Sequence, residues 1–255
     1  MEHRIKTRVA PSDQTRMTGV LGLGALAMIA VDALVGVRLL LIALRTRGVP
    51  ETMLGAAFLL IGAIGYPATT MARRGVLPTV AANQLLFATG LAAQDLACFA
   101  VYVFTARTFH GGRAAARVGI ALGGLLLLAS WLAQRLVTGF DPLALNAPYL
   151  LGLVARAAAF AWAAAESLHH WRVARRRLAI GLVAPILVER FLLFGVGMGG
   201  VFAAFVAFAI GQLVTANPAE STWVLAVTGA AGLLASVPTC LAFMPPASYR
   251  RRFAL

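Results

Sequence analysis

Residues 181–214 read GLVAPILVERFLLFGVGMGGVFAAFVAFAIGQLV, and only Glu189 and Arg190 in this run are charged. A helix needs roughly 20 mostly apolar residues to cross the hydrocarbon core of a bilayer. An apolar run of this length is too long for a buried helix of a soluble protein. The stretch therefore predicts a transmembrane helix that is longer than one crossing of the bilayer requires.

Six more apolar stretches fill most of the chain, at 18–44, 52–71, 80–105, 116–136, 148–168 and 221–244. Hydrophobic residues make up 60% of the sequence and charged residues 12%, whereas a soluble domain has about 25% charged residues. We therefore predict an all-α, polytopic bundle of seven transmembrane helices over 18–249. A basic N-terminal tail (1–17) and a short basic C-terminal tail (250–255) would flank it. The stretches 18–44 and 181–214 are longer than a crossing requires, so tilted helices are expected there.

The basic residues predict which way round the bundle sits. The formal net charge is +13, which in a soluble domain would suggest nucleic acid, but here most basic residues lie between apolar stretches and would meet anionic lipid headgroups. One end of the bundle would carry Arg45, Arg47, Arg107, Arg113, Arg117, Arg172, Arg175, Arg176, Arg177, Arg250, Arg251 and Arg252. The other end would carry Arg73, Arg74 and Arg135, with Arg4, Lys6, Arg8 and Arg16 in the N-terminal tail.

Because positive charge accumulates on cytoplasmic loops, the C-terminus is predicted in the cytoplasm and the N-terminus outside. The basic N-terminal tail runs against this orientation. The general character of the chain is that of a bacterial protein of the cytoplasmic (inner) membrane.

Proline and glycine residues mark where helices should bend or touch. Pro67 and Pro238 should kink their helices. Residues 195–200 formally match a phosphate-binding G-x-G-x-x-G, but no strand precedes them. Gly195 and Gly199 instead have the small-xxx-small spacing that lets another helix approach closely, and such faces would also allow a homodimer.

A parallel repeat is a further hypothesis. The first three and last three spans would form two similar triplets joined by the fourth, a 3+1+3 plan known among transporters. The third member of each triplet contains Thr-Gly followed by a cysteine: Thr89, Gly90 and Cys98 in one, and Thr228, Gly229 and Cys240 in the other. The spacings differ between the two.

Ionisable residues inside spans are costly and are therefore functional candidates. With about 1.5 Å rise per residue, Asp32, Asp95, Glu189 and Arg190 are predicted to form one charged layer in the inner half of the membrane. Arg190 would be the partner of Asp32 or Asp95. Such charges can be structural ion pairs that fix helix register, or can line a water-filled cavity or proton relay.

Arg156 is predicted to stand apart from this layer, about 12 Å below the outer surface by the same rise. A guanidinium matches carboxylate or phosphate groups bidentately. We therefore predict an outward-opening polar cavity for a small anionic ligand. Its other members would be Tyr66, Asn83, Gln84, Gln134 and Gln212.

Cofactor chemistry is not indicated. Cys98 and Cys240 fall inside spans, where thiols are usually inert packing residues, and no metal-ligand spacing occurs around them. A retinal Schiff base would need a lysine in the last span, yet Lys6 is the only lysine. His169 and His170 follow Glu166 at the cytoplasmic end, either as a pH-sensing pair or as interfacial residues.

Three classes of function remain open. The first is a receptor-like or sensory protein that binds a small ligand in the outer cavity. It would signal to a cytoplasmic protein through the basic patch of Arg172, Arg175, Arg176 and Arg177. The second is a small proton-coupled secondary transporter that uses the intramembrane carboxylates. The third, a membrane enzyme, lacks a nucleophile–base pair or a metal site in the sequence.

Overall fold

The computed structural model describes residues 11–111, 113–215, 221–246 and 248–249, and all regular elements in these ranges are helical. They are α1 (Pro11–Thr46), α2 (Val49–Phe58), the π-helix η1 (Leu59–Gly65), α3 (Tyr66–Arg73), α4 (Val80–His110), α5 (Ala114–Thr138), α6 (Ala147–Leu178), α7 (Pro185–Val214) and α8 (Thr222–Phe243). The predicted tails lie largely outside the described residues, although the backbone of α1 is described from Pro11.

Six of these helices are long and apolar enough to cross a membrane. They are Val49–Arg73, which combines α2, η1 and α3, and the helices α4, α5, α6, α7 and α8. α1 is a further long helix. The prediction of an all-helical membrane protein is thus confirmed for the described part of the chain.

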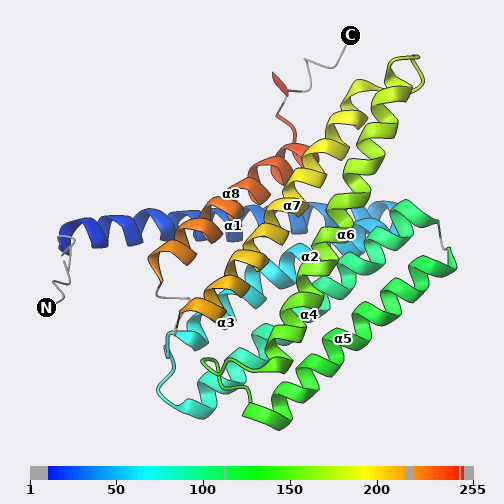
Figure 1. Cartoon of the computed structure of the whole chain (residues 1–255). Helices are drawn as coiled ribbons and strands as arrows, with labels where there is room; N and C mark the ends of the chain where they lie inside the picture. Colours follow the sequence, from blue (N-terminus) through cyan, green and yellow to red (C-terminus); the bar gives the residue numbers. More distant parts are fainter. Residues whose placement is uncertain (1–10, 112, 216–220, 247, 250–255) are drawn as a thin grey trace, which may run out of the picture.

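The helices form a closed set of neighbours around the bundle. α1 contacts α2, α2 contacts α4, α4 contacts α6, α6 contacts α7, α7 contacts α8, and α8 returns to α1. α5 packs on the outside against α4 and α6. Figure 1 shows α1 crossing α8 at an angle. The C-terminal half of α1 runs antiparallel beside α2 and η1, with Gly36 against Gly55 and Asp32 against Gly62.

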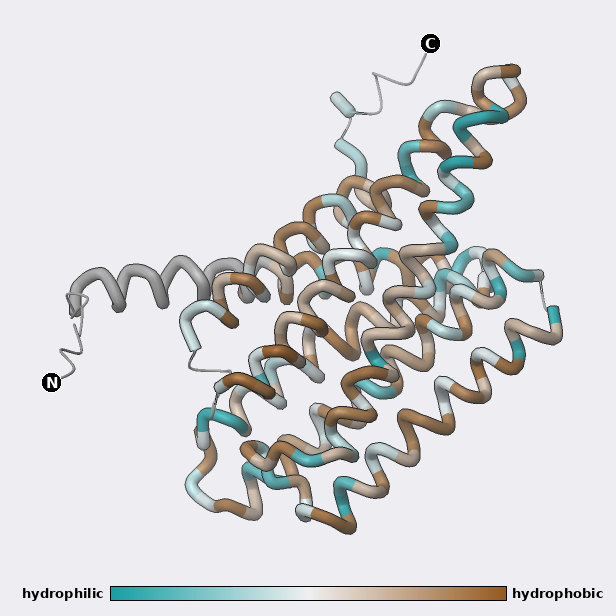
Figure 2. The backbone as a smooth tube through the Cα atoms, viewed as in Figure 1, coloured by the Kyte–Doolittle hydropathy of each residue, from teal (hydrophilic) through white to brown (hydrophobic). Residues whose placement is uncertain are grey.

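The two ends of the bundle differ in charge. We call the end formed by the connections α1–α2, α4–α5 and α6–α7 the basic end, and the end formed by α3–α4, α5–α6 and α7–α8 the opposite end. In Figure 1 the α6–α7 hairpin extends beyond its neighbours at the basic end. Figure 2 shows hydrophilic residues gathered along this part of α6.

A π-helix, η1, precedes Pro67, the residue at which the sequence predicts a bend. Proline cannot donate a backbone hydrogen bond, and its ring clashes with the carbonyl four residues earlier. The last residue of η1 is Gly65, two residues before Pro67. The wider turns of a π-helix accommodate the backbone hydrogen bond that Pro67 cannot donate. Gly62 in η1 lies directly against the side chain of Asp32 on α1, where any side chain would overlap the carboxylate.

Glycine residues of α7 allow close contact with two different neighbouring helices, α6 and α8. A Cβ on Gly200 would lie 2.7 Å from the backbone nitrogen of Ala235, and Gly197 lies against Thr239, so both face α8. Gly195 faces Leu168 of α6, and a Cβ on Gly199 would meet nothing within 4 Å. The prediction that Gly195 and Gly199 share one helix contact within the chain is therefore wrong, because Gly195 faces α6 whereas Gly199 faces open space.

Candidate functional site

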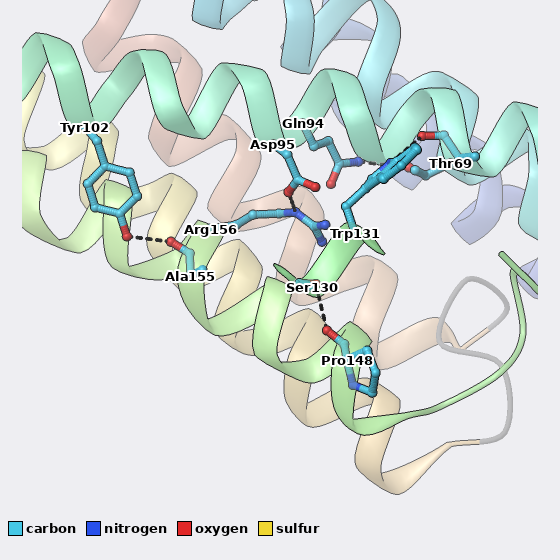
Figure 3. Close-up of polar contacts among 10 residues, drawn as sticks. Thr69, Gln94, Asp95, Tyr102, Ser130, Trp131, Pro148, Ala155 and Arg156 are labelled. Carbon is cyan, nitrogen blue, oxygen red and sulfur yellow. Dashed lines mark hydrogen bonds and ion pairs between the residues drawn. The ribbon is translucent and has the colours of Figure 1, made fainter. Parts of the chain in front are cut away.

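A buried ion pair joins α4 to α6. Nε of Arg156 donates to Oδ1 of Asp95 at 2.7 Å. Arg156 is 0% exposed and Asp95 is 8% exposed. Figure 3 shows the two side chains projecting toward each other from their helices.

The partner of Asp95 is therefore Arg156, and the prediction of Arg190 is wrong. Depths counted from the ends of the apolar stretches take all helices to start at the same membrane boundary. On that basis Asp95 and Arg156 lie at different depths in the membrane. The 2.7 Å contact shows that counting residues from the span ends does not give the relative depth of these two side chains. Arg190 is exposed on the bundle surface, Glu189 is half-buried, and Asp32 is buried against η1. No ion pair joins Arg190 to Asp32 in the described residues.

α5 contributes polar groups beside the guanidinium. Ser130 donates to the carbonyl of Pro148 at 2.7 Å, and Trp131 donates to the carbonyl of Ala88 at 3.3 Å (Figure 3). A Cβ on Gly152 would overlap Oγ of Ser130 and lie 3.3 Å from Nη2 of Arg156. Glycine at this position therefore makes room mainly for the Ser130 hydroxyl, with the guanidinium of Arg156 close beside it.

The pair is incompletely satisfied by the protein. Oδ2 of Asp95 and Nη1 and Nη2 of Arg156 are buried without a hydrogen-bond partner in the described residues. Nε2 of Gln134, one helical turn after Ser130 on α5, is likewise buried and unpaired. A buried polar group left unpaired costs about 1–3 kcal/mol, and more when it is charged. The site therefore offers donors and an acceptor to water or to a small polar molecule.

A second buried arginine lies toward the opposite end. Arg73 is 7% exposed, and its guanidinium lies over the rings of Phe87, Tyr149 and Phe208 at 5.2, 5.2 and 5.3 Å. With its amide oxygen turned toward Arg73, Gln212 accepts from Nη1 at 2.8 Å and from Nη2 at 3.1 Å. We call these five residues the Arg73 cage.

The Arg73 cage adjoins the ion pair through α6. Tyr149 precedes Arg156 by seven residues, which places both on the same face of the helix. Sequence reasoning placed Arg73 in a loop, and this prediction is wrong because the last turn of α3 is buried by aromatic rings from α4, α6 and α7. A single sequence carries no signal that would bring those rings together.

A hydrogen bond also links α3 to the helix that carries Asp95. Gln94, the neighbour of Asp95, donates to Oγ1 of Thr69 at 3.0 Å (Figure 3), and Thr69 donates to the carbonyl of Gly65 at 2.9 Å. The end of η1 is thereby tied to α4 at the level of the ion pair.

The other predicted ligand residues occupy different surroundings. Asn83 donates to the carbonyls of Leu77 and Thr79 at 2.8 and 3.0 Å and accepts from the backbone of Leu77 at 3.2 Å, so it holds the α3–α4 loop. Tyr66 and Gln84 are half-buried, and Gln134 is 1% exposed. The outward-opening cavity predicted around Arg156 is not open in this structure, because Arg156 is fully buried.

Toward the basic end, the pair is followed by a packed apolar core. Along α4 and α6, many of the buried apolar residues that come after Asp95 and Arg156 belong to one hydrophobic cluster, which also includes parts of α1, α2, α5 and α7. Its fully enclosed members are Val35, Ala97, Cys98, Val101, Ala159, Ala163 and Met198. The ion pair is therefore sealed from the basic end.

A separate polar group lies at the basic end. Nε2 of His110 is 3.1 Å from Oε1 of Glu166, and Nδ1 of His170 is 2.9 Å from the carbonyl oxygen of Glu166, which requires a proton on that nitrogen. The sequence singled out Glu166 and His170, whereas His110 comes from the end of α4. His169 is exposed.

These features define a class: a helical, membrane-like protein with an interior ion pair between two helices that are long and apolar enough to cross a membrane. No family model, curated protein or solved structure matches the chain.

Proposed function

We propose that the chain is a receptor-like membrane protein in which a small polar ligand binds beside Arg156 and changes the contact between α4 and α6. The observation that carries the proposal is the set of buried, unpaired atoms on Asp95 and Arg156. Packed apolar residues lie on both sides of the pair, with the larger cluster toward the basic end and a smaller one, around Phe87, Leu91 and Tyr149, toward the opposite end. The smaller cluster surrounds the polar Arg73 cage, so we propose that a ligand enters from the opposite end, past this cage.

The charges of the site favour a particular kind of ligand. Asp95 neutralises Arg156, so an anion bound there would add an uncompensated charge to a buried site. A neutral molecule with an acceptor for Nη1 or Nη2 and a donor for Oδ2 would satisfy both partners. The anionic ligand expected from Arg156 alone is therefore less well supported.

The proposed orientation has seven crossings, with α1 as the first, the N-terminus outside and the basic end in the cytoplasm of a bacterium. The arginines on the basic end support it. Arg45, Arg47, Arg107, Arg113, Arg117, Arg172, Arg175, Arg176 and Arg177 are all exposed there. At the opposite end Arg74 and Arg135 are exposed, but Arg73 is withdrawn into its cage. The outward position of α5 accords with its role as the joining helix of a 3+1+3 repeat.

Signalling would proceed from the ion pair to the basic end. Ligand binding would compete for the groups that hold α4 against α6, and both helices continue to the basic end. The exposed patch of Arg172, Arg175, Arg176 and Arg177 would then be the surface presented to a cytoplasmic signalling protein.

A proton-coupled transporter is the alternative, favoured by the burial of two carboxylates, Asp32 and Asp95, within the bundle. It requires access to the site from both ends in turn. The larger of the two packed cores lies on the side of the basic end, and this difference favours the receptor-like proposal.

Cysteine accessibility separates these functions. In a Cys98→Ala/Cys240→Ala background, Ser130→Cys would be treated with a membrane-impermeant methanethiosulfonate in right-side-out and inside-out vesicles. Ser130 is fully buried in this structure, so its modification requires the proposed entry path to open. We expect modification only from the face of the opposite end. Leu127→Cys, one turn away in the packed core, is the matched control and should stay unmodified from both faces.

Two other labelling results would contradict the receptor-like proposal. Modification of Ser130→Cys from both faces would indicate alternating access and therefore transport. No modification from either face would show that the ion pair is structural.

A further inference from the structure

The α6–α7 hairpin carries two adjoining hollows. The first, of about 510 Å³, is lined by Trp171, Arg172, Arg175, Arg176 and Ala179. The second, of about 280 Å³, shares Trp171 and Arg175 with it. It continues between α6 and α7 along Leu178, Pro185, Val188, Glu189 and Leu192. The two hollows thus join a basic region to an apolar one.

The first hollow has the chemistry of a phosphate site. Arg172, Arg175 and Arg176 are all exposed, and guanidinium groups match phosphate oxygens bidentately. The guanidinium of Arg175 lies 5.8 Å from the centre of the Trp171 ring, which orients it beside the hollow. No acidic side chain lines this first hollow.

The second hollow has the chemistry of an acyl-chain groove. Leu178, Pro185, Val188 and Leu192 supply apolar surface, with Glu189 as the one charged residue besides Arg175. Tryptophan is enriched where a membrane meets water, and Trp171 stands where the basic and apolar hollows meet. The turn that follows also exposes Ile180 and Leu182, which are 69% and 71% accessible.

We propose that this hairpin binds an anionic phospholipid, with the headgroup phosphate on Arg172, Arg175 and Arg176 and an acyl chain along the groove between α6 and α7. The mixture of arginine and apolar surface fits a lipid better than a nucleic acid or an acidic peptide, which would leave the apolar hollow uncovered. Basic pockets between transmembrane helices on the cytoplasmic side bind anionic headgroups in this way. The site stands independently of the ligand proposed at Arg156. It uses Arg172, Arg175 and Arg176 of the patch proposed above for a cytoplasmic protein, so lipid and protein would compete for these residues.

Native mass spectrometry tests the lipid site. The full chain, purified in a neutral detergent, would be mixed with equal amounts of phosphatidylglycerol and phosphatidylcholine, and the lipid retained per chain would be counted. We expect phosphatidylglycerol to be retained preferentially. Arg172→Gln/Arg175→Gln/Arg176→Gln should reduce its affinity by about tenfold or more, since each basic residue contributes separately.

The matched control is Arg45→Gln/Arg113→Gln/Arg117→Gln, which removes the same charge from exposed positions at the same end. This variant should retain phosphatidylglycerol as the unmodified chain does. An equal loss in both variants would mean diffuse attraction rather than a site. Equal retention of both lipids by the unmodified chain would also overturn the proposal.

Discussion

Replacing Arg156 with glutamine is expected to lower the free energy of unfolding by about 3–5 kcal/mol. Arg156 is fully buried, and its loss leaves the carboxylate of Asp95 in the bundle interior without a cation. Asp95→Asn should have a smaller effect of the same sign, because Arg156 is then unpaired but lies beside Ser130 and its hydroxyl. Unfolding in mixed detergent micelles, followed by circular dichroism, measures each value.

The double variant Asp95→Asn/Arg156→Gln is the control for this prediction. Removing both charges of a buried pair costs less than removing one, so the double variant should be more stable than the two single losses imply. A coupling energy of about 0.5–3 kcal/mol is expected for residues in contact. Simple additivity of the two losses would show that the charges do not interact in the folded protein.

Replacing Gly200 with leucine is expected to separate α7 from α8 and to cost about 1–3 kcal/mol or more. A Cβ at this position would lie 2.7 Å from the nitrogen of Ala235 and 2.9 Å from the oxygen of Ala231. Both are backbone atoms, so no change of rotamer can relieve the overlap. The same unfolding measurement checks the result.

Gly199→Leu provides the matched control on the neighbouring residue. A Cβ on Gly199 would meet nothing within 4 Å, and leucine is the better helix former by up to about 1 kcal/mol. The Gly199 variant should therefore be as stable as the unmodified chain or more stable. Equal losses in the two variants would contradict the packing of α7 on α8.

The positions of the helices could be predicted from hydropathy, but some of their ends could not. The apolar stretch at 148–168 lies inside α6, which continues to Leu178. Hydropathy falls where arginines begin, whereas helical hydrogen bonding continues through them. Pro67 predicted a bend in its helix but not the π-helix that precedes it. The crossing of α1 depends on how whole helices pack, which a single sequence does not specify.

The sequence could predict which residues form the site, but not which of them contact one another. Asp95 and Arg156 were both singled out because charge inside a span is costly. Their pairing depends on the offset and rotation of α4 and α6, which residue counting from helix ends does not give. Arg73 was missed because its position beside Arg74 resembles a loop. Its burial depends on aromatic rings from three other helices.

The central claim is that the ion pair between α4 and α6 holds a polar molecule that the protein itself does not supply. A high-resolution cryo-electron microscopy map of the chain in lipid nanodiscs tests it most directly. We expect ordered density that is not protein at about 2.7–3.2 Å from Nη1 or Nη2 of Arg156 and from Oδ2 of Asp95. A dry site with no such density, in which protein groups pair with those atoms, would contradict the account.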